Sequence, residues 1–198
     1  MAVPKSQPVE IHAHAMDNLR YIRGTMERAG SFTAVPGLGG VLMGSTALVT
    51  AWIATSPLGV DHWMTIWTIE CAIGVLVGVA AAALKARRLQ VPLLRGPGRK
   101  FIAGFAPAIF AGAALTIVLH DAGIFWYLPG IWLLLYGTAV LSAGWGSVAA
   151  VPVMGVCFMA VGLLALLRPD LPRNVLLAAG FGGLHIIFGS IIAVKHGG

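Results

Sequence analysis

Charged residues are scarce in this sequence, and acidic residues are scarcer still. Lys, Arg, Asp and Glu make up 10% of the 198 residues, and only 7 residues are acidic. Soluble domains carry about 25% charged residues, so this scarcity excludes an ordinary soluble domain. Hydrophobic residues reach 58%. The composition therefore places the chain among membrane proteins.

Residues and motifs that carry chemistry are also few. The cysteines Cys71 and Cys157 both fall within apolar runs, where cysteine behaves as a small hydrophobic residue. The sequence has no His-Glu-x-x-His motif and no paired aspartates within an apolar run. Gly144-Trp145-Gly146-Ser147 has the wrong order for the Gly-x-Ser-Gly motif of intramembrane serine proteases. We therefore expect neither enzymatic activity nor a cofactor.

Six apolar runs of membrane-spanning length dominate the remainder. Each is roughly 20 residues long, which matches a hydrocarbon layer of about 30 Å. The prediction is an all-α integral membrane protein, with a transmembrane domain over residues 34–198 that forms one compact bundle of six helices. The expected spans are 35–55, 63–84, 101–119, 124–143, 147–167 and 175–194. We expect the first run to be the insertion signal, because a polar segment precedes it.

The positive residues lie beside the predicted spans, where they orient a chain in a membrane. The links after spans one and three have no Lys or Arg, whereas the link after span two is basic: Lys85, Arg87, Arg88, Arg95, Arg99 and Lys100. This asymmetry predicts a multi-pass protein with both termini cytoplasmic, and the small size suggests a bacterial-type cytoplasmic membrane. We expect lipid around the spans and no nucleic-acid partner, because no basic face of a folded surface is predicted.

Residues 1–33 form a separate cytoplasmic segment in this interpretation. An amphipathic helix is expected over about residues 8–30, because apolar residues recur there at spacings of three and four: Ile11, Ala15, Leu19, Ile22, Met26 and Ala29. Such a helix either lies on the membrane surface or against the bundle, or docks a partner. The partner would be a second copy of the chain or another membrane or cytoplasmic protein.

A weak internal repeat relates the even-numbered spans. When their glycines Gly74, Gly137 and Gly189 are aligned, Glu70, Leu133 and His185 occupy one equivalent position. The pattern favours three helical hairpins in parallel orientation. Similar composition of apolar helices explains the same pattern equally well.

Glu70 and His185 are the candidate functional residues. Glu70 is the one carboxylate within a predicted span, and His185 lies near the middle of the last span. Ionisable groups in hydrocarbon are costly unless paired or hydrated, so they often mark a substrate or proton pathway. We expect the two side chains to approach each other inside the bundle. The alternative is that each simply hydrogen-bonds a neighbouring helix.

Small residues and one proline are candidates for helix packing or for hinges. Pro36-Gly37-Leu38-Gly39-Gly40 is not a phosphate loop, because no strand precedes it and an apolar span follows. Small residues let helix backbones approach closely, and glycine also allows a break in a helix. The candidates are Pro36, Gly39, Gly40, Gly44, Gly74, Gly78, Gly137 and Gly189.

A metal site is a weaker hypothesis. Two predicted outer loops pair a carboxylate with an imidazole, Asp61 with His62 and Asp121 with His120. These donors suit a divalent ion such as zinc. Short polar loops contain the same residues without any metal, and that interpretation is simpler.

Two functions lead at this point, and an intramembrane enzyme comes third. The first is a small transporter or channel-like protein with Glu70 and His185 along its path. The second is a non-catalytic membrane scaffold or sensor subunit, which binds a partner through the N-terminal helix and the basic link between spans two and three.

Overall fold

The computed structural model describes residues 14–19, 21–22 and 32–197. The chain divides into two units, Met1–Ser31 and Phe32–Gly198. In the first unit, residues 14–19 and 21–22 are helical. The remainder of the helix expected at 8–30 lies outside the described residues, so its amphipathic character stays a prediction.

The second unit contains six helices that are long and apolar enough to cross a membrane. They confirm the six helices expected from the sequence and are consistent with a polytopic membrane protein. Their elements are α2 (Gly37–Thr55), α4 (Trp63–Leu89), α5 (Gly96–Asp121), η1 (Phe125–Tyr127) with α6 (Leu128–Gly144), α7 (Ala150–Leu167), and α8 (Arg173–Leu177) continued by the π-helix η2 (Ala178–Leu184) and α9 (His185–His196). A short helix, α3 (Pro57–Asp61), lies between α2 and α4.

Local sequence explains several helix ends. Pro36 is the extended residue before α2, and proline is tolerated there because the first turn needs no amide donor. The Ser56 hydroxyl accepts a hydrogen bond from the Gly59 amide at 3.2 Å and so caps α3. Gln90 ends α4 in the left-handed conformation, with φ at 54°.

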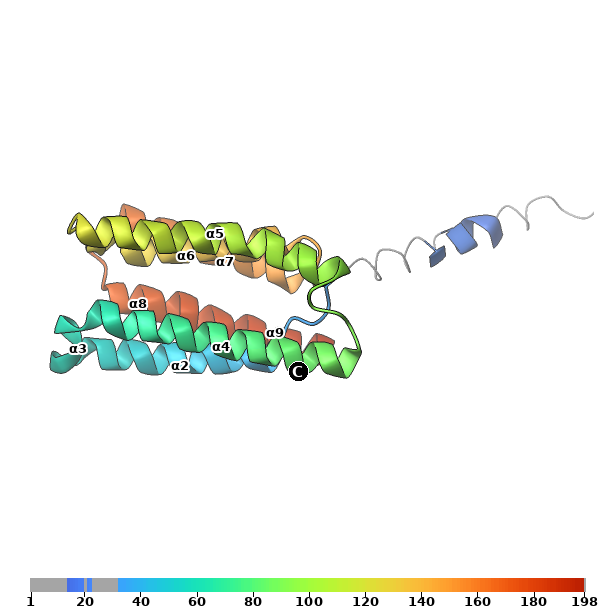
Figure 1. Cartoon of the computed structure of the whole chain (residues 1–198), viewed down its shortest axis with the longest axis horizontal. Coiled ribbons are helices and arrows are strands. Elements are labelled where there is room, and N and C mark those ends of the chain that lie inside the picture. Colours follow the sequence, from blue (N-terminus) through green and yellow to red (C-terminus); the bar gives the residue numbers. More distant parts are fainter. Residues whose placement is uncertain (1–13, 20, 23–31, 198) are drawn as a thin grey trace, which may run out of the picture. The chain divides into compact units, whose positions relative to one another are not determined.

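The helices of the second unit form two layers (Figure 1). One layer contains α5, α6 and α7, and the other contains α2, α4, α8 and α9. We call the end of this unit that carries Phe32 and Gly197 the terminal end, and the end that carries α3 the distal end. The link between α4 and α5 lies at the terminal end (Figure 1).

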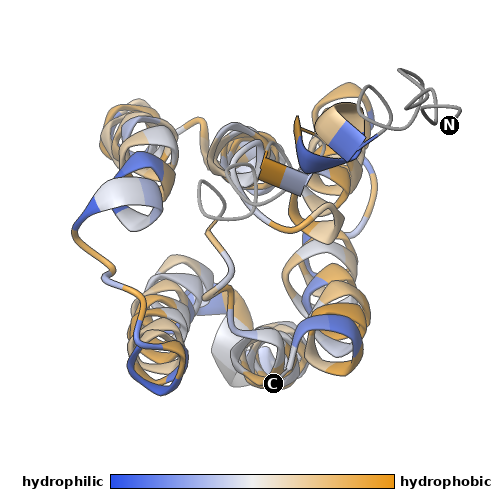
Figure 2. Cartoon of the chain, turned by 90° about the vertical axis from the view of Figure 1, so that its right-hand side faces the viewer, coloured by the Kyte–Doolittle hydropathy of each residue, from blue (hydrophilic) through white to orange (hydrophobic). Residues whose placement is uncertain are grey.

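Each layer has a central helix. α6 packs between α5 and α7, and α2 packs between α4 and the span formed by α8, η2 and α9 (Figure 2). Glycines permit these contacts: a Cβ added at Gly44 would lie 2.6 Å from the Gly182 oxygen, and one at Gly137 would lie 2.7 Å from the Gly155 oxygen. The backbones of α2 and α6 are therefore in close contact with their partners.

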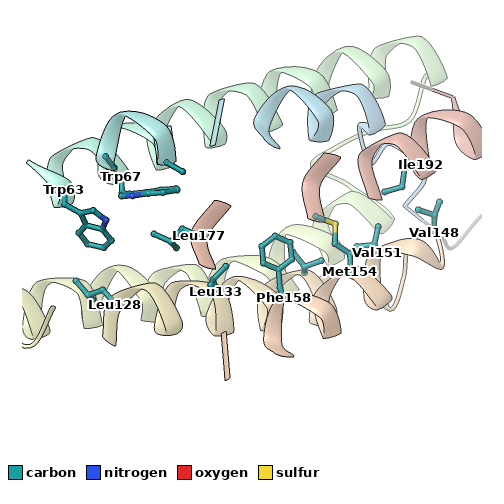
Figure 3. Close-up of a cluster of buried hydrophobic side chains, with 13 residues drawn as sticks. Trp63, Trp67, Leu128, Leu133, Val148, Val151, Met154, Phe158, Leu177 and Ile192 are labelled. Atoms are coloured by element: carbon teal, nitrogen blue, oxygen red, sulfur yellow. The ribbon is translucent and has the colours of Figure 1, made fainter. Parts of the chain in front are cut away.

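The core lies between the layers (Figure 3). Its largest fully buried side chains are Phe158, Leu128, Leu133 and Leu177. Most contacts between layers involve α6, α7, α8, η2 and α9, whereas α4 and α5 are not packed along each other. Between Glu70 and Lys85, α4 has no buried residue. One side of the bundle is therefore much less tightly packed than the other.

The predicted hairpin repeat receives mixed evidence. α2 packs with α4, and α5 with α6, as hairpins require, but α7 packs chiefly on α6 and α9 chiefly on α2. The three aligned positions, Glu70, Leu133 and His185, are all buried. The repeat stays a prediction. Its third hairpin, the fifth and sixth spans, is not closely packed, because α7 and α9 belong to different layers.

Candidate functional site

Glu70 is buried in α4, and its side chain is directed to α2. The residue is 7% exposed. Thr46 Oγ1 lies 2.8 Å from Glu70 Oε1, and Thr50 Oγ1 lies 2.8 Å from Glu70 Oε2. The two threonines are four residues apart on α2, so their hydroxyls share one helix face. Each carboxyl oxygen therefore has its own hydroxyl partner.

The hydroxyl of Thr46 has two neighbours but only one proton. Its Oγ1 lies 2.8 Å from Glu70 Oε1 and 2.9 Å from the Met43 carbonyl oxygen. When Glu70 is ionised, Thr46 donates to the carboxylate. When Glu70 is protonated, its own O–H donates to Thr46 Oγ1, and Thr46 donates to Met43 O. The site thus satisfies both protonation states without moving a heavy atom.

His185 is buried at the start of α9, directly after the π-helix η2, and is 4% exposed. Its Nδ1 lies 2.9 Å from the Phe181 carbonyl oxygen, which can only accept, so Nδ1 donates. Its Nε2 lies 2.7 Å from the Tyr136 hydroxyl. In the neutral imidazole, Nε2 accepts from that hydroxyl, and both ring nitrogens are satisfied.

Aromatic rings enclose His185. We call Tyr136, Phe158, Phe181 and His185 the aromatic cluster; the ring centroids of Tyr136 and Phe158 lie 4.8 Å apart, and those of Phe158 and His185 lie 5.2 Å apart. These rings come from α6, α7, η2 and α9, so the cluster joins the two layers. Its surroundings are apolar, and its polar atoms are already paired.

The two predicted pathway residues belong to different hydrogen-bonded groups. Glu70 pairs with α2, whereas His185 pairs with α6 and with the carbonyl of Phe181. Within residues 32–197 no hydrogen bond joins them. The prediction that both turn away from lipid fits their burial. That the two side chains approach each other along one substrate or proton pathway stays a hypothesis, which no hydrogen bond between them supports.

Tryptophans close the distal end between the layers. Trp63 and Trp67 both donate their indole N–H to Asn174 Oδ1, at 2.7 and 3.1 Å. Trp63 stacks on Trp132 of the other layer with centroids 5.5 Å apart, and the Arg173 guanidinium lies 4.5 Å from the Trp63 ring. The stacked pair of Trp63 and Trp132 therefore joins the two layers at this end.

The terminal end is tied together by Lys85. Its buried ammonium donates to the Val35 oxygen at 3.0 Å and to the Gly197 oxygen. Phe32 adds a second tie, because its amide donates to the Gly146 oxygen and its oxygen accepts from the Ser147 hydroxyl at 2.8 Å. Lys85, counted among the basic residues of the link, is thus a structural residue.

The predicted packing and hinge positions separate into two groups. Pro36 directly precedes α2. Gly39 faces Ala81, Gly40 and Gly44 face the last span, Gly189 faces α2, and Gly137 faces α7. These glycines lie at helix contacts. Gly78 has only the Met43 side chain nearby, and an added Cβ at Gly74 would meet nothing within 4 Å. The glycines that follow Glu70 on α4 are therefore not needed for close packing.

The residues of the weak metal hypothesis lie at the distal end. Asp61 ends α3, His62 follows it, and both are exposed. His120 Nδ1 lies 3.5 Å from Asp121 Oδ1. Within the described part of the chain, no three His, Cys, Asp or Glu side chains gather as a metal-binding group. The two pairs do not combine into the donor set that zinc uses.

Sequence reasoning missed the partners of the ionisable residues. Thr46 and Thr50 are spaced by four residues, and Tyr136 directly precedes the glycine used to align the repeat. Those spacings are the signals that could have found them. Asn174 gave no comparable signal.

Comparison with protein-family models, with curated proteins and with solved structures found no match to this chain. The assignment to polytopic membrane proteins therefore depends on the six apolar helices themselves.

Proposed function

We propose that this chain is a small transporter or channel-like membrane protein in which proton exchange at Glu70 accompanies transport. The observation that carries the proposal is the hydrogen bonding of Glu70. Its two threonine partners and the Met43 carbonyl accommodate the ionised and the protonated carboxyl alike. An ionisable side chain within a membrane-spanning helix is by default a candidate for a proton or substrate pathway.

The packing around Glu70 supports a moving role. Between Glu70 and Lys85, α4 has only exposed and half-buried residues, and α4 is not packed along α5. Gly74, one turn further, has open space where a side chain would begin. This part of α4 contacts α2, with Ala81 beside Gly39 and Gly78 beside Met43, but is not packed along α5. A change of charge at Glu70 therefore acts on the contact between α2 and α4.

His185 has a different role in this proposal. The aromatic cluster holds the layers together, and neither imidazole nitrogen is left for a transported species. We therefore assign proton exchange to Glu70 alone and treat His185 as a structural residue that helps to hold the layers together. We also infer a bacterial-type cytoplasmic membrane with both termini inside, because the cations gather at the terminal end.

The test measures proton movement, because the proton is the one species that the proposal names. Full-length protein in liposomes that enclose a pH-sensitive dye is exposed to a pH gradient at a fixed potassium diffusion potential. We expect proton entry above that of protein-free liposomes, reduced at least tenfold by Glu70→Gln. Asp61→Asn, which removes an exposed carboxyl at the distal end, serves as the matched control and should keep the flux.

Two results would reject the proposal. One is wild-type flux equal to that of protein-free liposomes, and the other is full flux in Glu70→Gln. Infrared spectra of the purified protein add a second readout, because pH titration should show a protonated carboxyl band that Glu70→Gln abolishes. Glutamine can repeat the hydrogen bonds of the protonated carboxyl, so this variant is expected to fold.

A scaffold is the second candidate, and the aromatic cluster favours it. A protein that only organises partners needs no hydrated path between its helices. The aromatic cluster fits this role, because its surroundings are apolar and its polar atoms are hydrogen-bonded to each other or to the backbone. A scaffold would lose a co-purifying partner when the residues before Gly30 are deleted, and its proton flux would be absent.

A further inference from the structure

The last turn of α4, the link that follows and the start of α5 carry a group of exposed cations that have no acidic partner within residues 32–197. We call this group the basic collar: Arg87, Arg88, Arg95, Arg99 and Lys100. Within residues 32–197 the acidic residues are Asp61, Glu70, Asp121 and Asp170, and none of them pairs with the collar. The collar therefore has uncompensated positive charge in this part of the chain.

The collar is displayed on a fixed segment. The Val91 amide donates to the Ala86 oxygen at 3.0 Å, and Leu93 packs against Phe32 and Ala86. The next residue, Leu94, is 77% exposed. Exposed leucine between arginines is typical of a segment that lies at a membrane surface, with its apolar side chain in lipid and its cations at the headgroups.

Apolar surface continues from the collar along both adjoining helices. Between Glu70 and Lys85, α4 has no buried residue, and in α5 only Gly98 is buried. Figure 2, viewed from the terminal end, shows the link joining α4 and α5, with hydrophilic residues near these helix ends. The cations match the anionic headgroup of a phospholipid, and the exposed apolar surface of the two helices matches its acyl chains.

We propose that the basic collar binds an anionic phospholipid, with its phosphate among Arg95, Arg99 and Lys100 and its acyl chains along α4 and α5. Charge complementarity selects an anionic headgroup, because clustered Lys and Arg beside a transmembrane helix attract anionic lipid. The adjoining apolar surface selects a lipid over a soluble phosphate compound. This inference does not depend on proton exchange at Glu70.

The test is native mass spectrometry of the full-length protein in detergent. The probe is an equal mixture of phosphatidylglycerol and phosphatidylcholine with identical acyl chains. We expect the wild type to retain phosphatidylglycerol preferentially, and Arg99→Gln to lower that retention about fivefold. Arg99→Lys keeps the charge and should restore most of the retention.

Lys195→Gln is the matched control, because it removes an exposed cation of α9 outside the collar. It should leave retention unchanged. Equal retention of the two lipids would overturn the proposal, and so would an equal loss from Lys195→Gln, which would indicate general surface charge only. Complete displacement by millimolar inorganic phosphate would reject the contribution of the acyl chains.

Discussion

Glu70 and His185 are both buried ionisable residues of a membrane-spanning helix, yet their surroundings have opposite character. His185 is enclosed by the rings of Tyr136, Phe158 and Phe181, in the region where the layers meet. Glu70 contacts two hydroxyls on the side of the bundle where α4 is loosely packed. Burial alone therefore does not separate a structural ionisable residue from a functional one. The two residues differ in their hydrogen-bond partners, which are two hydroxyls of α2 for Glu70 and a tyrosine hydroxyl and a backbone carbonyl for His185.

The largest expected effect is on the free energy of unfolding, when a packed aromatic residue and an exposed one are each replaced by alanine. Phe158→Ala empties a fully buried position in the aromatic cluster and should lower the free energy of unfolding by about 3–5 kcal/mol. Phe110→Ala, at a position 78% exposed on α5, should change it by less than about 1 kcal/mol. Unfolding in mixed micelles measures both. Equal losses would show that the two sides of the bundle are equally packed.

Glycine substitutions test the same contrast in the backbone. Gly44→Ala places a Cβ 2.6 Å from the Gly182 oxygen and should destabilise the bundle by about 1–3 kcal/mol. Gly74→Ala meets nothing within 4 Å, and alanine favours a helix over glycine by about 1 kcal/mol, so no loss is expected. Thermal unfolding compares the two, and a destabilising Gly74→Ala would contradict the open surroundings of that residue.

A smaller difference in the free energy of unfolding is expected when His185 and Glu70 each lose one hydroxyl partner. Tyr136→Phe leaves His185 Nε2 without its donor in an apolar cluster, at a cost of about 1–2 kcal/mol. Thr50→Val removes one of the two hydroxyl partners of Glu70 and leaves Thr46 in place, so about 0.6 kcal/mol is expected. The unfolding free energies of both variants decide the order. The reverse order would make Glu70 the more rigidly held residue.

The smallest effect belongs to an exposed ion pair. The hydrogen bond from Arg168 lowers the pKa of Asp170 below its ordinary range. The pair therefore adds stability at pH values above the ordinary aspartate range and loses it as the pH falls through the lowered pKa. Both side chains are exposed, so the gain is slight and screened by salt. Asp170→Asn should lower the melting temperature slightly at neutral pH and leave it unchanged in acid.

Much of the bundle could be predicted from the sequence because hydrocarbon constrains it strongly. Helix length and apolar composition follow from the bilayer, so the six spans were predicted to within a few residues, apart from longer ends such as that of α4 at Leu89. The burial of Glu70 and His185 followed from the cost of charge in lipid.

The partners of these residues could not be predicted in the same way. Which helices meet depends on the layer order, and periodicity carries no information on the neighbour of a fully apolar helix. α9 packs on α2, so the sixth span does not form a simple hairpin with the fifth. For the same reason the sequence did not indicate that Tyr136 would reach His185, or that Thr46 and Thr50 would face Glu70.

The hydrogen bonds of Lys85 hold the two ends of the six-span unit together. One ammonium contacts the carbonyl oxygens of Val35 and Gly197, so residues far apart in the sequence are neighbours in space. A short peptide could therefore join the two ends of the six-span unit into a ring without displacing a helix. Such cyclisation would restrict the unfolded chain more than the folded one and so raise thermal stability.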